Sequence, residues 1–159
     1  MIFLIADTHF EDKDVIDICG RPKKQDLLLV NHWNTTVKDS DEVYLLGDVG
    51  NLDYIKELNG RIYLVTGNHD WRYSLGDLEQ AFYKVYDKPI ILDDFYILSH
   101  EPLPYIQPNG VFANIFGHVH NSPHITTYSS RHYCVSAERI NYTPVSFEEI
   151  KSKMKFAEN

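Results

Sequence analysis

The sequence predicts an α/β domain, and three observations support this class. The chain has 159 residues, which is close to the commonest size of a single domain. Apolar runs alternate with amphipathic segments up to about residue 65, and short strand-like runs separated by turn residues follow. A hydrophobic content of 43% with 24% charged residues is ordinary for a globular protein. Because there is no internal repeat, low-complexity tract or linker, we expect one domain over residues 1–159.

The first part of the chain is predicted to form parallel β-α-β units. Residues 1–6 read as a buried strand that ends at Asp7, and an apolar face at helical spacing predicts a helix over 24–37. Further strands are expected over 43–46 and 61–65, with a short helix over 52–58 between them. Right-handed crossovers would place the carboxyl ends of these strands at one edge of the sheet, where ligands collect in such folds.

The second part is richer in turn residues and predicts a more antiparallel sheet. Its expected strands cover residues 89–92, 95–98, 111–116, 125–128 and 132–135. A last helix is predicted from Ser146 into the Lys-rich tail.

Five polar motifs each follow an apolar run: Asp7-Thr-His9, Gly47-Asp48-Val-Gly50, Gly67-Asn68-His69-Asp70, Ser99-His100 and Gly117-His118-Val-His120. In extended backbone, residues two apart point the same way, so the two side chains of an Asp-x-His or His-x-His pair can share one ion. A carboxylate at position 48 could bridge two ions about 3.5–4 Å apart. The mixture of carboxylate, amide and imidazole suits Mn²⁺, Fe²⁺, Ni²⁺ or Zn²⁺.

Each motif alone also has an ordinary structural explanation, since an Asp at a strand end is usually a turn former or helix cap. The histidines argue against coincidence, because five of the eight lie in the motifs: His9, His69, His100, His118 and His120. For the other three, His32, His124 and His132, a structural role is the better interpretation.

Charge and cysteine content limit the partners and the compartment. The net charge of −8 indicates a solvated acidic surface. A second interpretation is that some of the carboxylates are metal ligands, whose charge bound cations would cancel. No basic stripe is present, so we expect no strong nucleic-acid binding. The two cysteines, Cys19 and Cys134, imply no disulfide framework and no sulfur-rich zinc site; we expect both to be buried, in a cytoplasmic protein. We expect no signal peptide or membrane span, and a monomer or homodimer.

Taken in order, the five motifs resemble those of the calcineurin-like metallophosphoesterase superfamily. The stretches Cys19-Gly-Arg-Pro22, Trp33-Asn34, Cys134-Val-Ser-Ala and Tyr142-Thr-Pro-Val-Ser-Phe-Glu-Glu149 are similar to its small, capless bacterial and phage branch. The resemblance implies two packed mixed β-sheets flanked by helices, an α/β/β/α sandwich of the metallo-dependent phosphatase type.

The resemblance also implies two divalent metal ions, with Mn²⁺ as the first choice and Ni²⁺, Fe²⁺, Zn²⁺ or Mg²⁺ as alternatives. Its implied ligands to the first ion are Asp7, His9, Asp48 and His120, and those to the second are Asp48, Asn68, His100 and His118. In such proteins the residue at His69 faces the phosphate and acts as the catalytic acid.

The implied reaction is hydrolysis of phosphodiesters, phosphomonoesters or both, in small substrates that include nucleotide-like ones. A hydroxide that bridges the two metals would attack in line. The alternative is a catalytically weak metal-binding scaffold that works through protein–protein interaction.

The chain departs from its relatives at a few positions. Asn51 stands where the phosphoprotein phosphatases carry an aspartate that pairs with the catalytic histidine, so Asp53, Asp70 or a main-chain carbonyl would have to replace it. Glu11 and Asp12 form an acidic pair that disfavours highly charged substrates unless Asp12 turns away. Arg21 and Arg72 are expected at the surface, and protein phosphatase activity is not expected.

Overall fold

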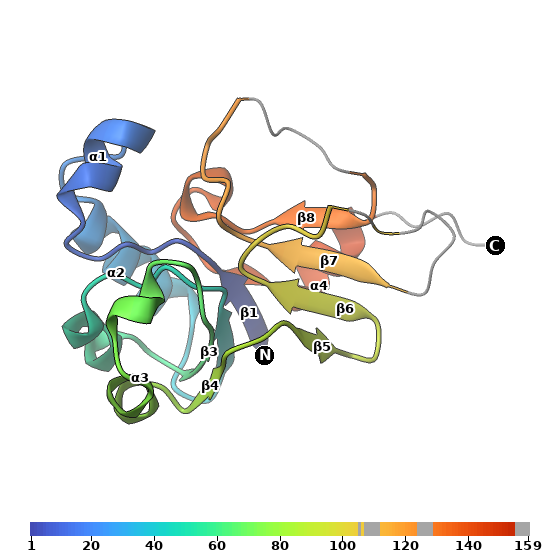
Figure 1. Ribbon diagram of the computed structural model, residues 1–159, viewed down its shortest axis with the longest axis horizontal. Coiled ribbons are helices and arrows are strands. Elements are labelled where there is room, and N and C mark those ends of the chain that lie inside the picture. The colour runs from blue at the N-terminus through green and yellow to red at the C-terminus, as the bar shows by residue number, and fades with distance from the viewer. Residues whose placement is uncertain (105, 107–111, 124–128, 155–159) are drawn as a thin grey trace.

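The computed structural model describes residues 1–104, 106, 112–123 and 129–154, and it consists of two β-sheets with helices around them (Figure 1). The first sheet has the order β4-β3-β2-β1-β9 and the second the order β5-β6-β7-β8. The strands of the first sheet are β1 (Ile2–Ile5), β2 (Glu42–Leu45), β3 (Arg61–Val65), β4 (Lys84–Tyr86) and β9 (Val145–Ser146). Those of the second are β5 (Ile90–Leu92), β6 (Tyr96–Ser99), β7 (Ala113–Phe116) and β8 (His132–Cys134). The predicted fold class is confirmed.

Both sheets are mixed. In the first, β1 to β4 are parallel as predicted, and β9 joins β1 in the antiparallel direction. In the second, only β5 and β6 are antiparallel, since the Asp93-Asp94 turn joins them, whereas β7 is parallel to both β6 and β8. The prediction of a more antiparallel second sheet was therefore wrong. The reason is that the segments between β6 and β7 and between β7 and β8 are long enough to bring the chain back to the end of the sheet where the preceding strand began. The next strand can therefore run in the same direction.

The helices agree with the sequence in part. The predicted helices over 24–37 and from Ser146 are α2 (Gln25–Thr36) and α4 (Phe147–Lys153), and the short one over 52–58 is the 3₁₀ helix η1 (Leu52–Glu57). Two seven-residue helices, α1 (Lys13–Cys19) and α3 (Leu75–Ala81), and strand β4 were not predicted. Their end signals were present: Asp12 caps α1, and Ser74 with Asp77 forms a capping box on α3. The predicted strand over 125–128 lies outside the described residues.

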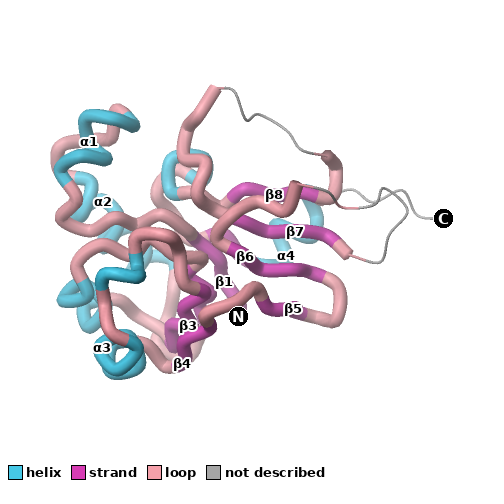
Figure 2. The backbone as a smooth tube through the Cα atoms, in the orientation of Figure 1, coloured by secondary structure: helices cyan, strands magenta, loops and turns pink. Residues whose placement is uncertain are grey.

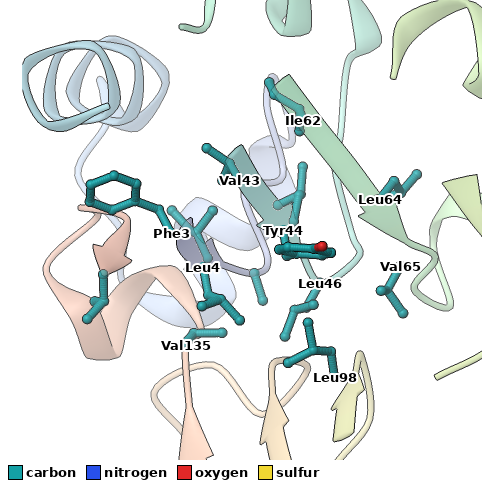
Figure 3. Packing of buried hydrophobic residues seen from close by; sticks show 14 of the residues in the cluster. Phe3, Leu4, Val43, Tyr44, Leu46, Ile62, Leu64, Val65, Leu98 and Val135 are labelled. Atoms are coloured by element: carbon teal, nitrogen blue, oxygen red, sulfur yellow. The ribbon is translucent and has the colours of Figure 1, made fainter. Parts of the chain in front are cut away.

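Part of the hydrophobic core lies between the two sheets (Figure 3), and the same cluster of buried residues extends to Leu29 and Trp33 of α2. Leu4 and Leu46 from the first sheet region pack in one cluster with Leu98 and Val135 from the second, and all four are fully buried. Trp33 of α2 is also fully buried, and its indole N–H donates to the carbonyl of Asn59 at 2.9 Å. Burial of this kind fixes the position of the two sheets relative to each other.

Loop backbone follows the carboxyl ends of β1, β3, β6 and β7, as Figure 2 shows. The polar motifs lie in these loops and in the one after β2, so packing of the sheets brings the five motifs to one edge of the sandwich. No helix in the described parts of the chain is long and apolar enough to cross a membrane. Cys19 and Cys134 are free thiols and only partly buried, contrary to the expectation that both would be buried.

Candidate metal centre

The glycines of the motifs allow the strand ends to approach one another closely. A Cβ atom on Gly117 would lie 2.4 Å from the Cβ of Ala6 and 2.9 Å from Oδ2 of Asp7. One on Gly67 would lie 2.4 Å from Oδ1 of Asp48. Both distances are shorter than real contacts, so a side chain at either position would push the motif loops apart.

The backbone at the motifs is left-handed at five residues that carry functional groups. The φ angles are 59° at Asp7, 45° at His9, 56° at Asp48, 69° at His118 and 47° at His120. The extended geometry from which we argued that Asp-x-His and His-x-His pairs share an ion is therefore not observed. Such φ values cost roughly 1–3 kcal/mol each and concentrate at functional sites, where the surrounding structure enforces them.

The first group of candidate ligands is Asp7, His9 and His120, whose ligand atoms all lie within 4.8 Å of one another. The Nδ1 atom of His9 lies 3.0 Å from a carboxylate oxygen of Asp12, to which it donates. The Nε2 atom of His9 lies 3.5 Å from Oδ2 of Asp48 and is buried without a hydrogen-bond partner among the described residues. A buried nitrogen of this kind needs a partner, and a cation would supply one.

The second group is Asp48, His100 and His118, with Asn68 beside it. Nε2 of His100 lies 2.9 Å from Oδ1 of Asn68, 3.1 Å from Nδ1 of His118 and 3.3 Å from Oδ2 of Asp48. Atoms that coordinate one ion at about 2.0–2.3 Å lie near 3 Å from each other, so these separations fit a shared ion. The Nδ1 atom of His100 donates to the carbonyl of Leu46 at 2.8 Å, which leaves Nε2 for coordination.

Asp48 connects the two groups. Its Oδ1 atom accepts from the backbone N–H of His69 at 2.9 Å, while Oδ2 faces His9 on one side and His100 on the other. This is the arrangement expected of a bridging carboxylate. Among the described residues, the structure thus brings together all seven proposed ligands.

The charges of this cluster depend on one another. Burial would lower the pKa of His100, but its hydrogen bond to Asp48 and the charge of Asp7 raise that pKa to about 9. Burial opposes the charged form of Asp48, yet a hydrogen bond from His100 and the nearby imidazole of His9 hold the pKa of Asp48 far below its usual range. Burial raises the pKa of Asp7. The cluster therefore holds protons that a divalent cation would displace.

Glu138 and Arg21 support the first group, and sequence reasoning missed both roles. Oε1 of Glu138 accepts from Nδ1 of His120 at 3.0 Å and from Nε of Arg21 at 2.7 Å. These contacts outweigh burial and lower the pKa of Glu138 to about 2. Arg21 also donates to the carbonyls of Asp7 and Thr8, at 2.7 and 3.1 Å. Arg21 is buried, so the expectation of a surface role was wrong; Arg72 is exposed, as expected.

His69 lies beside the cluster but outside it. Its ring is exposed, with its centroid 5.5 Å from that of His9, and the described residues offer its side chain no hydrogen-bond partner. Neither candidate carboxylate orients it. Asp53 is exposed and pairs with Lys56, whereas buried Asp70 accepts from three backbone N–H groups of the neighbouring loops.

The remaining predicted positions have structural contacts. Asn51 caps η1 and donates to Glu11 at 2.7 Å, while Asp12 caps α1 and turns toward His9. His32 contacts the carbonyl of Asn141 and the hydroxyl of Thr143, and His132 contacts the carbonyl of Leu103. His124 lies outside the described residues.

The fold and the site together define an α/β sandwich with buried His/Asp groups that could hold metal ions at one edge of its sheets. No protein-family model matches the chain. The chain is 32% identical to "Uncharacterized protein MJ1445" of Methanocaldococcus jannaschii, over 94% of this chain and 88% of that protein, and it belongs to the same family.

Two solved structures are similar. One is a protein of unknown function, AQ665 from Aquifex aeolicus, with a TM-score of 0.78 and 27% identity, over 96% of this chain and 98% of that one. The other is nuclease MPE of Pseudomonas putida, with a TM-score of 0.54 and 22% identity, over 75% of this chain and 61% of that one. At this identity the second likeness concerns the fold alone.

Proposed function

We propose that this protein is a metal-dependent phosphoesterase of the calcineurin-like metallophosphoesterase superfamily. The observation that carries the proposal is the pair of His/Asp groups joined by Asp48, with a buried Nε2 atom on His9 that has no hydrogen-bond partner within the described part of the chain. The order of the five motifs and the fold shared with nuclease MPE support it further.

In this proposal Asp7, His9, Asp48 and His120 hold one ion, and Asp48, Asn68, His100 and His118 hold the other. The bound ions would lower the pKa of a coordinated water and neutralise charge on the phosphoryl oxygens. The donor set suits Mn²⁺ and the other borderline divalent ions.

The chain supplies the remaining groups. Asp12, Glu138 and the carbonyl of Leu46 accept from the Nδ1 atoms of His9, His120 and His100, and thereby direct each Nε2 toward the ions. His69 as imidazolium would donate a proton to the leaving oxygen, and its exposed position leaves room for a substrate beside it.

The test combines metal analysis with hydrolysis of a panel of phosphomonoesters, phosphodiesters and nucleotide esters. Turnover with Mn²⁺, Ni²⁺ or Mg²⁺ that is abolished by chelator is the expected result. Metal-free protein and no turnover with any ion would overturn the proposal and favour the scaffold alternative.

A further inference from the structure

Two cavities are lined by candidate metal ligands, one cavity for each ligand group. A cavity of about 750 Å³ is lined by His9 and His120 of the first ligand group and by His69. A second, of about 340 Å³, is lined by Asn68 and His100 of the second ligand group. The two linings have no residue in common, so each cavity adjoins a different ligand group.

The walls of both cavities offer apolar surface away from the metal ligands. The first is lined by Val15 and Ile18 of α1 and by Tyr73. The second is lined by Leu103 and by Pro89, Pro102 and Pro104. Apolar walls with a few polar groups at one end suit an organic substituent attached to a charged centre.

We propose that the substrate is a phosphodiester whose two ester groups occupy these two cavities, an inference that rests on the proposed function. The phosphate lies over the metal centre, and the leaving group lies in the first cavity, because His69 lines it. A phosphomonoester has a single ester group and would leave one of the two cavities without an apolar occupant.

In the proposed hydrolysis, one bond to phosphorus forms and one breaks. A water oxygen forms a bond to phosphorus and loses one proton to solvent. The bond from phosphorus to the ester oxygen in the first cavity breaks, and that oxygen takes the proton of His69, which is restored from solvent. The products are an alcohol in the first cavity and a monoester whose remaining ester group stays in the second.

The charge of the walls favours the same substrate class. Apart from the proposed ligands, carboxylates outnumber cations around the cavities: Glu11, Asp12, Asp14, Asp87 and Glu101 against Lys13, Arg72 and Lys88. A diester has one negative charge, whereas a monoester at neutral pH carries close to two. Acidic walls therefore repel the monoester more strongly.

The test uses three substrates with the same leaving group and Mn²⁺-loaded protein: p-nitrophenyl phosphate, methyl p-nitrophenyl phosphate and bis(p-nitrophenyl) phosphate. If a ring fills the second cavity, kcat/KM for the bis-aryl diester should exceed that for the methyl diester at least about tenfold. The monoester should be the slowest of the three.

Thr66→Phe places a ring in the second cavity, which Thr66 lines. The ratio of the bis-aryl to the methyl rate should fall about tenfold, the advantage that the buried ring conferred. Because both substrates lose the same group, a general loss of activity cancels in this ratio. Thr35→Phe, at an exposed position on α2, is the control and should leave the ratio unchanged.

Equilibrium binding gives a second readout that needs no turnover. Diphenylphosphinate, with two rings and one charge, should raise the Tm of Mn²⁺-loaded protein more than phenylphosphonate, and Thr66→Phe should remove the difference. A monoester hydrolysed as fast as the bis-aryl diester, or equal binding of the two analogues, overturns this inference alone. If none of the three substrates is hydrolysed with any of the metals, the proposed function is overturned as well.

Discussion

Hydrogen bonds on Nδ1 orient three imidazoles of the candidate metal centre. His9 and His120 donate to carboxylates, those of Asp12 and Glu138, whereas His100 donates to the neutral carbonyl of Leu46. A carboxylate partner makes the opposite ring nitrogen a stronger ligand. At the residue scale, we therefore expect the affinity for metal to depend on side chains outside the proposed ligand set.

Asp12→Asn tests this dependence, because the remaining oxygen can still cap α1 while the carboxylate charge beside His9 is lost. We expect the affinity for Mn²⁺, measured by titration calorimetry, to fall about 10–100-fold. Asp17→Asn, at an exposed position on the same helix, is the matched control. Equal affinities of the two variants would contradict the role of Asp12.

His69→Ala should separate chemistry from metal binding. The backbone N–H that donates to Asp48 is kept in the variant, so metal content measured by elemental analysis should be nearly unchanged. Loss of the acid should lower kcat by roughly 10²–10⁴-fold. His32→Ala, remote from the motifs, should retain both properties. If the His69 variant lost its ions, the assignment of His69 as the acid would be wrong.

At the scale of elements, the position of the site depends on how closely the strand ends pack. The loops after β1, β2, β3 and β7 meet where only glycine fits at Gly67 and Gly117, and left-handed residues then turn their side chains toward one point. Among the helices, α1 contributes to the site in two ways. Asp12 caps its start, and residues of the helix line the cavity of about 750 Å³.

Gly117→Ala tests the close packing of strand ends. The new Cβ would lie 2.4 Å from Ala6, so β7 must move away from β1. We expect a loss of about 1–3 kcal/mol in the free energy of unfolding, measured by urea denaturation.

Gly76→Ala in α3 is the matched control, because its Cβ would meet no atom closer than 3.8 Å. That substitution should leave stability unchanged or raise it by roughly 0.5–1 kcal/mol, since alanine favours the helix. Equal effects of the two substitutions would contradict the packing argument.

For the whole molecule, we expect the candidate centre to couple the stability of the fold to pH and to metal binding. The pKa of His100 in the folded protein is about 9, above the ordinary value of 6.5. A raised pKa stabilises the fold below the ordinary value and loses this contribution as pH rises through the folded one. His120, whose pKa is raised by its hydrogen bond to Glu138 in spite of burial, acts in the same direction.

The Tm of metal-free protein should therefore fall as the pH rises from about 6.5 to about 9. With Mn²⁺ bound, His100 is held without its proton, so the Tm should be higher and the difference from metal-free protein should grow with pH. Thermal unfolding with chelator or with Mn²⁺ measures both curves. A metal-free curve that is flat over this range, or one unchanged in His100→Ala, would contradict the coupling.

The sequence alone was sufficient for the local elements and for the identity of the candidate ligands. The strands β1, β2 and β3 and the helix α2 follow from runs and periodicities of neighbouring residues. The first three motifs follow strands that were predicted to be parallel, so the order of the chain already places those three at one edge of the first sheet. The elements α1, α3 and β4 were missed because each is short and lies outside a long apolar run.

The tertiary structure decided everything that joins distant parts of the chain. Glu138 meets His120 and Arg21, which is 117 residues away, and the burial of that arginine could not be read from its neighbours. The strand directions in the second sheet, the backbone geometry of the motif residues and the two cavities lined by candidate ligands were also undetermined by sequence. The physical reason is that local patterns depend on adjacent residues, whereas these features arise only when two separately formed sheets pack together.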